Sequence, residues 1–184
     1  MKILGITFIL IIIGFQQDSD RQSFLSFISN AEVIKLPLNY SCYTIPSSKY
    51  ELINNTYLEK FINRDSYFVG RIYKTRKFTT LIFGQVADNN YPVVYTFTQN
   101  GFPIDTLEMS GSCFTGPDGT EQTYSCNIET NGNFTITDTL KSYRLDQKGN
   151  IIPTSESLEI VSNRYKLNDS GMFTQTKTKK KKLK

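Results

Sequence analysis

Turn signals divide the chain from residue 66 onward into short segments of strand-forming residues. Asn100-Gly101, Asn131-Gly132 and Lys148-Gly149-Asn150 are three of these signals. An Asn-Gly pair supplies the positive φ angles that a two-residue type I′ hairpin requires. The runs between the turns are rich in β-branched and aromatic residues, which favour strands. Connections of this length join neighbouring antiparallel strands and leave no room for crossover helices.

The segment around Asn100-Gly101 shows this pattern in most detail. Val93, Tyr95 and Phe97 occupy every second position before the turn, so they form one apolar face of a strand. After the turn, Ile104 and Leu107 are separated by an odd step, which predicts a β-bulge in the returning strand.

The regular turns predict a mainly β fold. We expect residues 66–175 to form one antiparallel up-and-down meander of about seven or eight strands, curled into a barrel-like or strongly curved sheet. A two-sheet β-sandwich is the alternative. Residues 18–65 form an N-terminal helical and extended section, in which residues 19–30 and 54–63 each gather apolar residues at helical spacing. Two short helices are therefore expected there.

The first residues predict export. Lys2 precedes an apolar run from Ile3 to Phe15, and polar residues follow at once. The run is too short for a stable membrane anchor, which needs about 20 apolar residues, and it is typical of a secretory signal. We assign residues 1–17 as a signal peptide, with cleavage after Gly14 or near Gln17. No cysteine follows the run, so we expect a periplasmic or extracellular protein with no lipid anchor and no transmembrane span.

The last residues are dominated by lysine. Residues 176–184 hold six lysines: Lys177, Lys179, Lys180, Lys181, Lys182 and Lys184. The formal net charge of the whole chain is +4, so this segment accounts for its basic character. A block of like charges usually stays solvated and extended, which predicts a disordered polybasic tail. Weak contact with an anionic surface is the functional alternative, since lysines are attracted to anionic headgroups or polyanionic polysaccharide.

The chain has three cysteines, Cys42, Cys113 and Cys126. Cys113 and Cys126 flank a turn between Gly116 and Gly119, so the two arms of a hairpin could bring them together. Export to an oxidising compartment favours a disulfide between them. Pairing of Cys42 with either of the other two stays open, as does the alternative of three reduced thiols.

Several segments together resemble a group of small exported proteins of Gram-negative bacteria, which have a β-meander domain and no assigned activity. The segments that carry the resemblance are Ser23–Phe27, Leu36-Pro37, Tyr95–Phe97 with Asn100-Gly101, Ile104–Leu107 and Tyr165–Gly171. Many members of that group carry a lipidated cysteine after the signal, and this chain does not. The resemblance implies a location at the cell envelope and brings no catalytic residue with it.

The sequence carries no recognisable catalytic or cofactor motif. With no histidine, the commonest metal ligand and general base is missing. We therefore predict no catalytic, cofactor-binding or metal-binding residues, no cofactor and no nucleic-acid partner. The leading hypothesis is an exported, non-enzymatic β-domain that binds a protein or glycan partner at the cell envelope. The alternative is a lipocalin-like carrier of a small apolar ligand, because an eight-stranded barrel can hold one such ligand.

Overall fold

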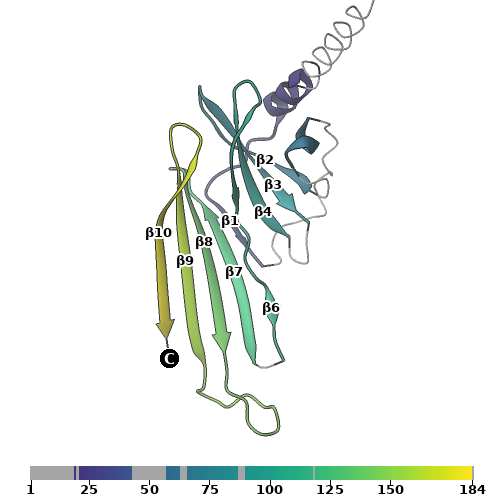
Figure 1. The fold of residues 1–184 in the computed structure, drawn as a ribbon. Helices are drawn as coiled ribbons and strands as arrows, with labels where there is room; N and C mark the ends of the chain where they lie inside the picture. The colour runs from purple at the N-terminus through teal and green to yellow at the C-terminus, as the bar shows by residue number, and fades with distance from the viewer. Residues whose placement is uncertain are drawn as a thin grey trace, which may run out of the picture.

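In the part of the chain that the structure describes, two antiparallel β-sheets and one N-terminal α-helix make up the fold (Figure 1). The computed structural model describes residue 19 and residues 21–42, 57–62, 66–86, 90–117 and 119–183, and residues 21–30 are helical. The four-stranded sheet has the order β2-β3-β4-β5, with β2 (Ser66–Lys74), β3 (Phe78–Gln85), β4 (Tyr91–Thr98) and β5 (Pro103–Glu108).

The six-stranded sheet joins the start of the described chain to its end. Its order is β1-β7-β8-β9-β10, with β1 (Leu38–Ser41), β7 (Thr120–Ile128), β8 (Asn133–Ser142), β9 (Ser157–Leu167) and β10 (Phe173–Leu183). The short strand β6 (Phe114–Thr115) pairs with the same edge of β7 as β1 does. Along that edge, β6 pairs with Glu121 and Gln122, and β1 pairs with residues 125–128. The strand β10 forms the opposite edge.

The predicted hairpins are confirmed in position, but their turns are not of the predicted type I′, because Asn100 and Asn131 do not have the positive φ angles that this type requires. Gly101, Gly132 and Gly171 have φ angles of 86°, 79° and 84° and lie in the hairpins β4–β5, β7–β8 and β9–β10. Few residues other than glycine adopt these angles without strain, which explains why the turns fall where they do. The bulge predicted after Asn100-Gly101 is also present, since Thr96 pairs with Asp105 and Phe97 with Pro103, leaving Ile104 out of the ladder.

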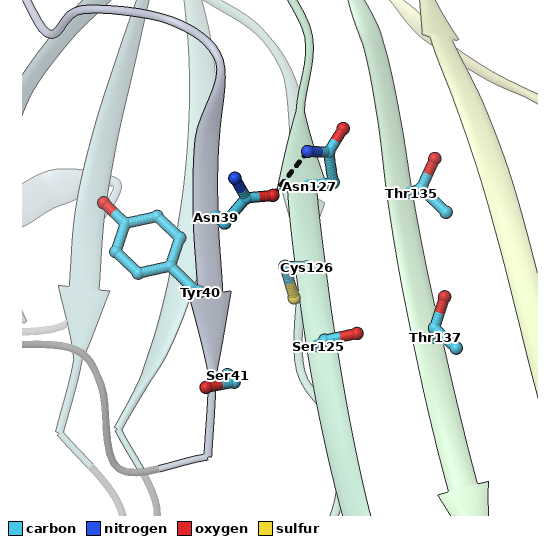
Figure 2. Close-up of a pocket in the computed structure, with 8 residues that line it drawn as sticks. All are labelled: Asn39, Tyr40, Ser41, Ser125, Cys126, Asn127, Thr135 and Thr137. Carbon is cyan, nitrogen blue, oxygen red and sulfur yellow. Dashed lines mark hydrogen bonds between the residues drawn. The ribbon is translucent and has the colours of Figure 1, made fainter.

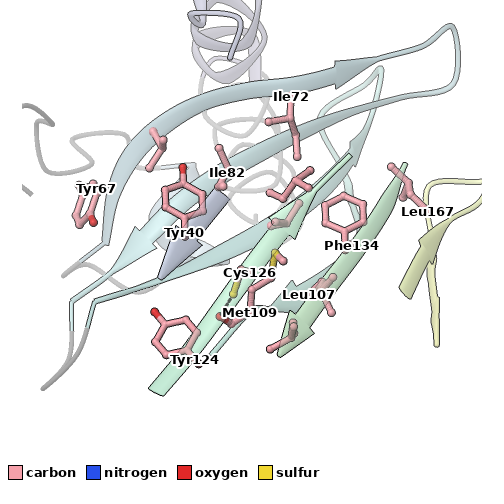
Figure 3. Packing of buried hydrophobic residues seen from close by; sticks show 14 of the residues in the cluster. Tyr40, Tyr67, Ile72, Ile82, Leu107, Met109, Tyr124, Cys126, Phe134 and Leu167 are labelled. Carbon is pink, nitrogen blue, oxygen red and sulfur yellow. Dashed lines mark hydrogen bonds between the residues drawn. The ribbon is translucent and has the colours of Figure 1, made fainter. Parts of the chain in front are cut away.

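The larger hydrophobic core lies between the two sheets (Figure 3). Ile82 of β3, Val94 of β4, Ile128 of β7 and Phe134 of β8 are fully buried there. Each comes from the face of its strand that alternation directs toward the other sheet. Burial of a side chain of this size stabilises the fold by about 1.5–3 kcal/mol, so this layer holds the two sheets together.

A second core covers the other face of the four-stranded sheet. Phe24 and Ile28 of the N-terminal helix pack against Leu81, Phe83 and Phe97. The layers are therefore the helix, the four-stranded sheet, the main core and the six-stranded sheet. The strands β7–β10 continue beyond the four-stranded sheet, so their far halves project from the body of the molecule (Figure 1).

The prediction of a single curved meander or barrel is wrong in its topology, although the mainly antiparallel β character is confirmed. The described strands form two open sheets that pack face to face, as in the sandwich alternative. The chain leaves the first sheet after Glu108, and β7 then pairs with β1 instead of β5. Turn spacing predicts neighbouring hairpins but gives no signal for a strand that pairs with a segment more than 80 residues away.

The prediction of two N-terminal helices is wrong for the second helix. Residues 21–30 form the first one, whereas the described part of the second contains only a 3-10 helix at Leu58–Lys60. Within the section predicted as helical and extended, residues 38–41 instead form β1 of the six-stranded sheet. The predicted signal peptide, residues 1–17, lies outside the described residues.

The prediction of a disordered lysine tail is wrong for residues 176–183. These residues belong to β10, which pairs with β9 from Phe173 to Leu183. The strand alternates lysine with threonine at its start, and threonine favours strands. As an edge strand, β10 keeps its lysine amines in solvent, and lysine is a common residue at such edges because it discourages pairing with other chains. Lys184 lies outside the described residues.

The predicted Cys113–Cys126 disulfide is also wrong. Cys42 and Cys113 form the bridge, with Cα atoms 5.8 Å apart, and Cys126 is a buried free thiol. The reason is the shared edge of β7. Cys42 follows β1 and Cys113 precedes β6, so the two meet opposite Tyr124, whose carbonyl accepts a hydrogen bond from the Cys42 amide at 3.2 Å. Cys126 lies opposite Tyr40 instead.

Candidate functional site

The outer face of the six-stranded sheet, the face turned away from the main core, is lined by hydroxyl and amide side chains. In β7 and β8 the core residues Cys126, Ile128, Phe134 and Ile136 alternate with polar residues that point outward. The outward residues of the three strands β1, β7 and β8 are Asn39, Ser41, Ser125, Asn127, Thr135 and Thr137. Each is half-buried or exposed, and none is charged.

These six side chains line a trough of about 270 Å³ (Figure 2). Its floor is formed where Tyr40 and Cys126 turn their side chains into the core. The Asn127 Nδ2 donates a hydrogen bond to the Asn39 Oδ1 across the β1–β7 pair. This bond orients both amides and leaves the Asn39 NH2 group and the Asn127 carbonyl available to a ligand.

The strand register places the side chains of the trough in line with side chains at the far edge of the sheet. In one row, Ser41, Ser125, Thr137, Ser162 and Lys179 lie opposite one another on five successive strands. The hydroxyl oxygens of Thr137 and Ser162 are 3.2 Å apart and share a hydrogen bond. We call this the serine row; it runs from neutral hydroxyls on β1 to a lysine amine on β10.

A second row lies beside it and has the same character. Asn39, Asn127, Thr135, Arg164 and Lys177 lie opposite one another on the same five strands. We call this the asparagine row. Because neighbouring strands are about 4.8 Å apart, the cations on β9 and β10 begin about 5–10 Å from the trough. The trough and the cations therefore form one continuous surface.

Cations outnumber carboxylates on this outer face. The strands β7–β10 direct six cations outward, Lys141, Arg164, Lys166, Lys177, Lys179 and Lys181. Two carboxylates face them. Glu121 lies 3.9 Å from the Lys141 amine, and Glu129 follows β7. Hydrogen bonds from Asn133 and Asn131, and then the charges of Arg164 and Lys166, hold the pKa of Glu129 below its usual range.

The three outward lysines of β10 differ from Lys141 in this respect. Among the residues that the structure describes, no carboxylate oxygen lies within 4 Å of the amines of Lys177, Lys179 or Lys181. The opposite side of the same strand differs. There the Lys180 amine lies 2.6 Å from Glu159. The hydrogen bond from Lys180, followed by the charges of Lys180 and Lys182, holds the pKa of Glu159 below its usual range.

A second hollow lies at the projecting end of the sheet. It has a volume of about 380 Å³ between the turn that contains Pro117 and the loop that follows β8. Tyr143, Leu145 and Ile151 contribute its walls. The backbone of this loop forms hydrogen bonds within itself, among them those from the Lys148 and Asn150 amides to the Asp146 carboxylate.

The remaining cysteine offers no reactive thiolate. Cys126 is buried in the main core, and its thiol donates a hydrogen bond to the Met109 carbonyl at 3.1 Å. Burial, followed by the charge of Asp138, raises its pKa to about 12. A thiol of this kind stays protonated and packs as a small apolar group. The described residues also contain no group of three or more histidine, cysteine, aspartate or glutamate side chains placed to hold a metal ion.

The residues that sequence reasoning singled out fall into different places. Cys113 and Cys126 lie near the β1–β7 edge but are not bonded to each other. Five of the six predicted tail lysines, all but Lys184, lie on β10 and divide between its two faces. The trough was missed altogether. Its signal is the alternation of residues 133–138, NFTITD, whose threonines mark the outward positions of β8.

Comparison with protein-family models, with curated proteins and with solved structures returned no significant match. Helices among the described residues are all too short or too polar to span a membrane.

Proposed function

We propose that this protein is an exported, non-enzymatic domain that binds a glycan at the cell envelope through the outer face of its six-stranded sheet. The observation that carries the proposal is the trough, a hollow lined by six neutral hydroxyl and amide side chains on a face that no described helix or strand covers. Sugars present hydroxyl groups that both donate and accept hydrogen bonds. Serine, threonine and asparagine match them in both roles.

A protein partner fits this face less well than a glycan. Protein interfaces are usually centred on buried aromatic and large apolar side chains. The outward residues of the trough include none, and the ring of Tyr40 belongs to the main core. A groove lined by polar side chains is what a glycan-binding face requires, whereas a protein partner predicts a flat apolar patch.

The carrier alternative rested on a closed barrel with an internal cavity. The strands that the structure describes form two open sheets, and Phe83, Phe97 and Phe134 are fully buried in the layers beside them. We therefore develop the binding hypothesis. The Cys42–Cys113 disulfide supports the export part of the proposal, because such bridges persist in oxidising compartments and are rare in the cytosol of most organisms.

A panel of purified polysaccharides, neutral and acidic, tests the proposal by affinity electrophoresis and calorimetry. The double variant Thr135→Val/Thr137→Val keeps the β-branched shape and removes two hydroxyls from the trough. If each hydroxyl makes one hydrogen bond worth about 1 kcal/mol, the double variant should weaken binding by about 25-fold.

The matched control is Thr106→Val/Thr178→Val. Both threonines are exposed on strands, Thr106 on β5 of the other sheet and Thr178 on the opposite side of β10. We expect the control to bind as the unmodified protein does. The proposal fails if the unmodified protein retains no polysaccharide of the panel, or if the control loses as much affinity as the trough variant.

A further inference from the structure

The serine row and the asparagine row both continue from the trough to cations on β9 and β10. These cations indicate which class of glycan the face would bind. We propose that the ligand is an anionic polysaccharide whose chain lies across the strands, with neutral sugar hydroxyls on the trough and carboxylate or sulfate groups on the outward lysines of β10. This inference rests on the proposed function. It adds a charge requirement and a direction to it.

The first support is the arrangement of charge on the two sides of the projecting sheet. The outer face carries six cations and two carboxylates, both near cations of their own. The opposite side carries two lysines, Lys180 and Lys182, and two carboxylates, Asp138 and Glu159, so its charges cancel. The excess positive charge therefore belongs to one face. Because it is the face that holds the trough, the sheet is suited to an anion that also has hydroxyl groups.

The second support is the spacing of the amines. Lys177, Lys179 and Lys181 alternate along β10, so their Cα atoms repeat at about 6.7 Å. A lysine amine is a compact charge on a flexible four-carbon stem, and it adapts to anionic groups at slightly different spacings. Three such amines in a line fit a polymer with repeated anionic groups better than a single small anion.

The third support is the absence of features that other polyanions need. Single-stranded nucleic acid stacks its bases on aromatic side chains, and the outward positions of the described strands β7–β10 include none. Stable binding to a membrane surface usually adds large apolar side chains, which enter the bilayer interface, to the attraction between lysines and anionic headgroups. On this face the apolar residues are Leu158, Ile160 and Leu183, at the far end from the trough, whereas Lys177 and Lys179 adjoin hydroxyl and amide rows.

The alternation of β10 supplies a matched pair of variants. Lys179→Gln/Lys181→Gln removes two outward amines, and Lys180→Gln/Lys182→Gln removes two amines from the opposite side of the same stretch of strand. Both variants lower the net charge by two. They differ in which side of the sheet loses the charge, and the second variant also removes the ion pair between Lys180 and Glu159. Size-exclusion chromatography and thermal unfolding establish that each remains a folded, unaggregated protein.

Binding of the full chain to polygalacturonate, to dextran sulfate and to neutral dextran is then measured at several salt concentrations. We expect the unmodified protein to bind at least one of the two anionic polymers and to lose affinity as salt rises, because salt screens exposed charges. At about fivefold for each lysine, the outward pair should weaken binding by about 25-fold, and the opposite pair by less than about twofold. The dependence on salt should also become shallower in the outward variant.

Each other outcome overturns the inference in a distinct way. If the protein binds neutral dextran as tightly as both anionic polymers, glycan binding stands and the charge requirement is wrong. If the two lysine pairs weaken binding equally, the face is not selective. Tighter binding to single-stranded DNA or to vesicles of anionic phospholipid assigns the cations to those partners instead. If no polysaccharide binds at all, the proposed function itself is wrong.

Discussion

The Cys42–Cys113 disulfide closes the edge of the six-stranded sheet over a sequence separation of 71 residues. A bridge over a loop of this length removes much conformational freedom from the unfolded chain. The chain-entropy relation gives about 4 kcal/mol of stabilisation at 25 °C. For a chain of this size, 1 kcal/mol shifts the midpoint of thermal unfolding by about 2–4 °C. We therefore expect the double variant Cys42→Ala/Cys113→Ala to unfold about 8–16 °C below the unmodified protein.

The assay is thermal unfolding followed by circular dichroism, with and without reductant. Reductant should lower the midpoint of the unmodified protein by a similar amount and leave that of the double variant unchanged. Cys126→Ala is the control, because it removes a buried sulfur without touching the bridge, and it should cost about 1 kcal/mol, as a typical substitution does. Peptide mapping should find Cys42 linked to Cys113. A link that includes Cys126, or a midpoint insensitive to reductant, would refute this reasoning.

Two further predictions concern the sheets themselves. Deleting Lys177 to Lys184 removes the part of β10 that pairs with residues 158–164 and leaves that part of β9 as an edge without lysines. We therefore expect a midpoint of thermal unfolding about 5 °C lower and aggregates in size-exclusion chromatography; a midpoint and elution volume unchanged by the deletion would mean that this part of β10 adds nothing to the fold. Gly84→Ala places a Cβ about 2.0 Å from Cζ of the buried Tyr67 ring, which should cost about 2 kcal/mol in unfolding free energy, whereas Thr106→Ala, at an exposed position, should cost much less; equal effects would contradict the close packing of Tyr67 on Gly84.

Local features of the fold were predictable because they depend on neighbouring residues. Asn100-Gly101 and Asn131-Gly132 require positive φ angles at glycine, and the structure has both. The bulge at Ile104 follows from the odd step to Leu107. The first helix follows from apolar residues at helical spacing, and Phe24 and Ile28 from that pattern are buried. Each of these features is determined within about ten residues of the chain.

Pairings between distant segments were not predictable in this way. Residues 38–41 carry no signal that they pair with residues 125–128 instead of forming an extended connector. The disulfide was predicted wrongly for the same reason, since Cys42 reaches Cys113 only after β1 has joined the edge of β7. The error in the tail has another cause. A block of lysines favours solvated chain by its own repulsion, but pairing with β9 outweighs that preference at a sheet edge, where the amines remain in water.

The candidate site combines a predictable part and an unpredictable part. Alternation in residues 133–138 already separates outward threonines from buried Phe134 and Ile136, so a polar face on β8 can be inferred from sequence. The extent of that face depends on strands from the two ends of the described chain, β1 at one edge and β10 at the other. Only in the assembled sheet does β1 add its side chains to the trough and β10 its outward lysines to the same face.

This dependence explains why the two edges are secured differently. At the β1 edge, the disulfide joins Cys42 to Cys113, and the Cys42 amide bonds to the Tyr124 carbonyl, which fixes Asn39 and Ser41 against β7. At the β10 edge, the outward lysines repel one another, and the Lys180–Glu159 pair lies on the opposite side of the strand. A polyanion on the outer face would neutralise that repulsion. If the proposed ligand binds there, it should therefore order β10 more than β1, because the disulfide already closes the β1 edge.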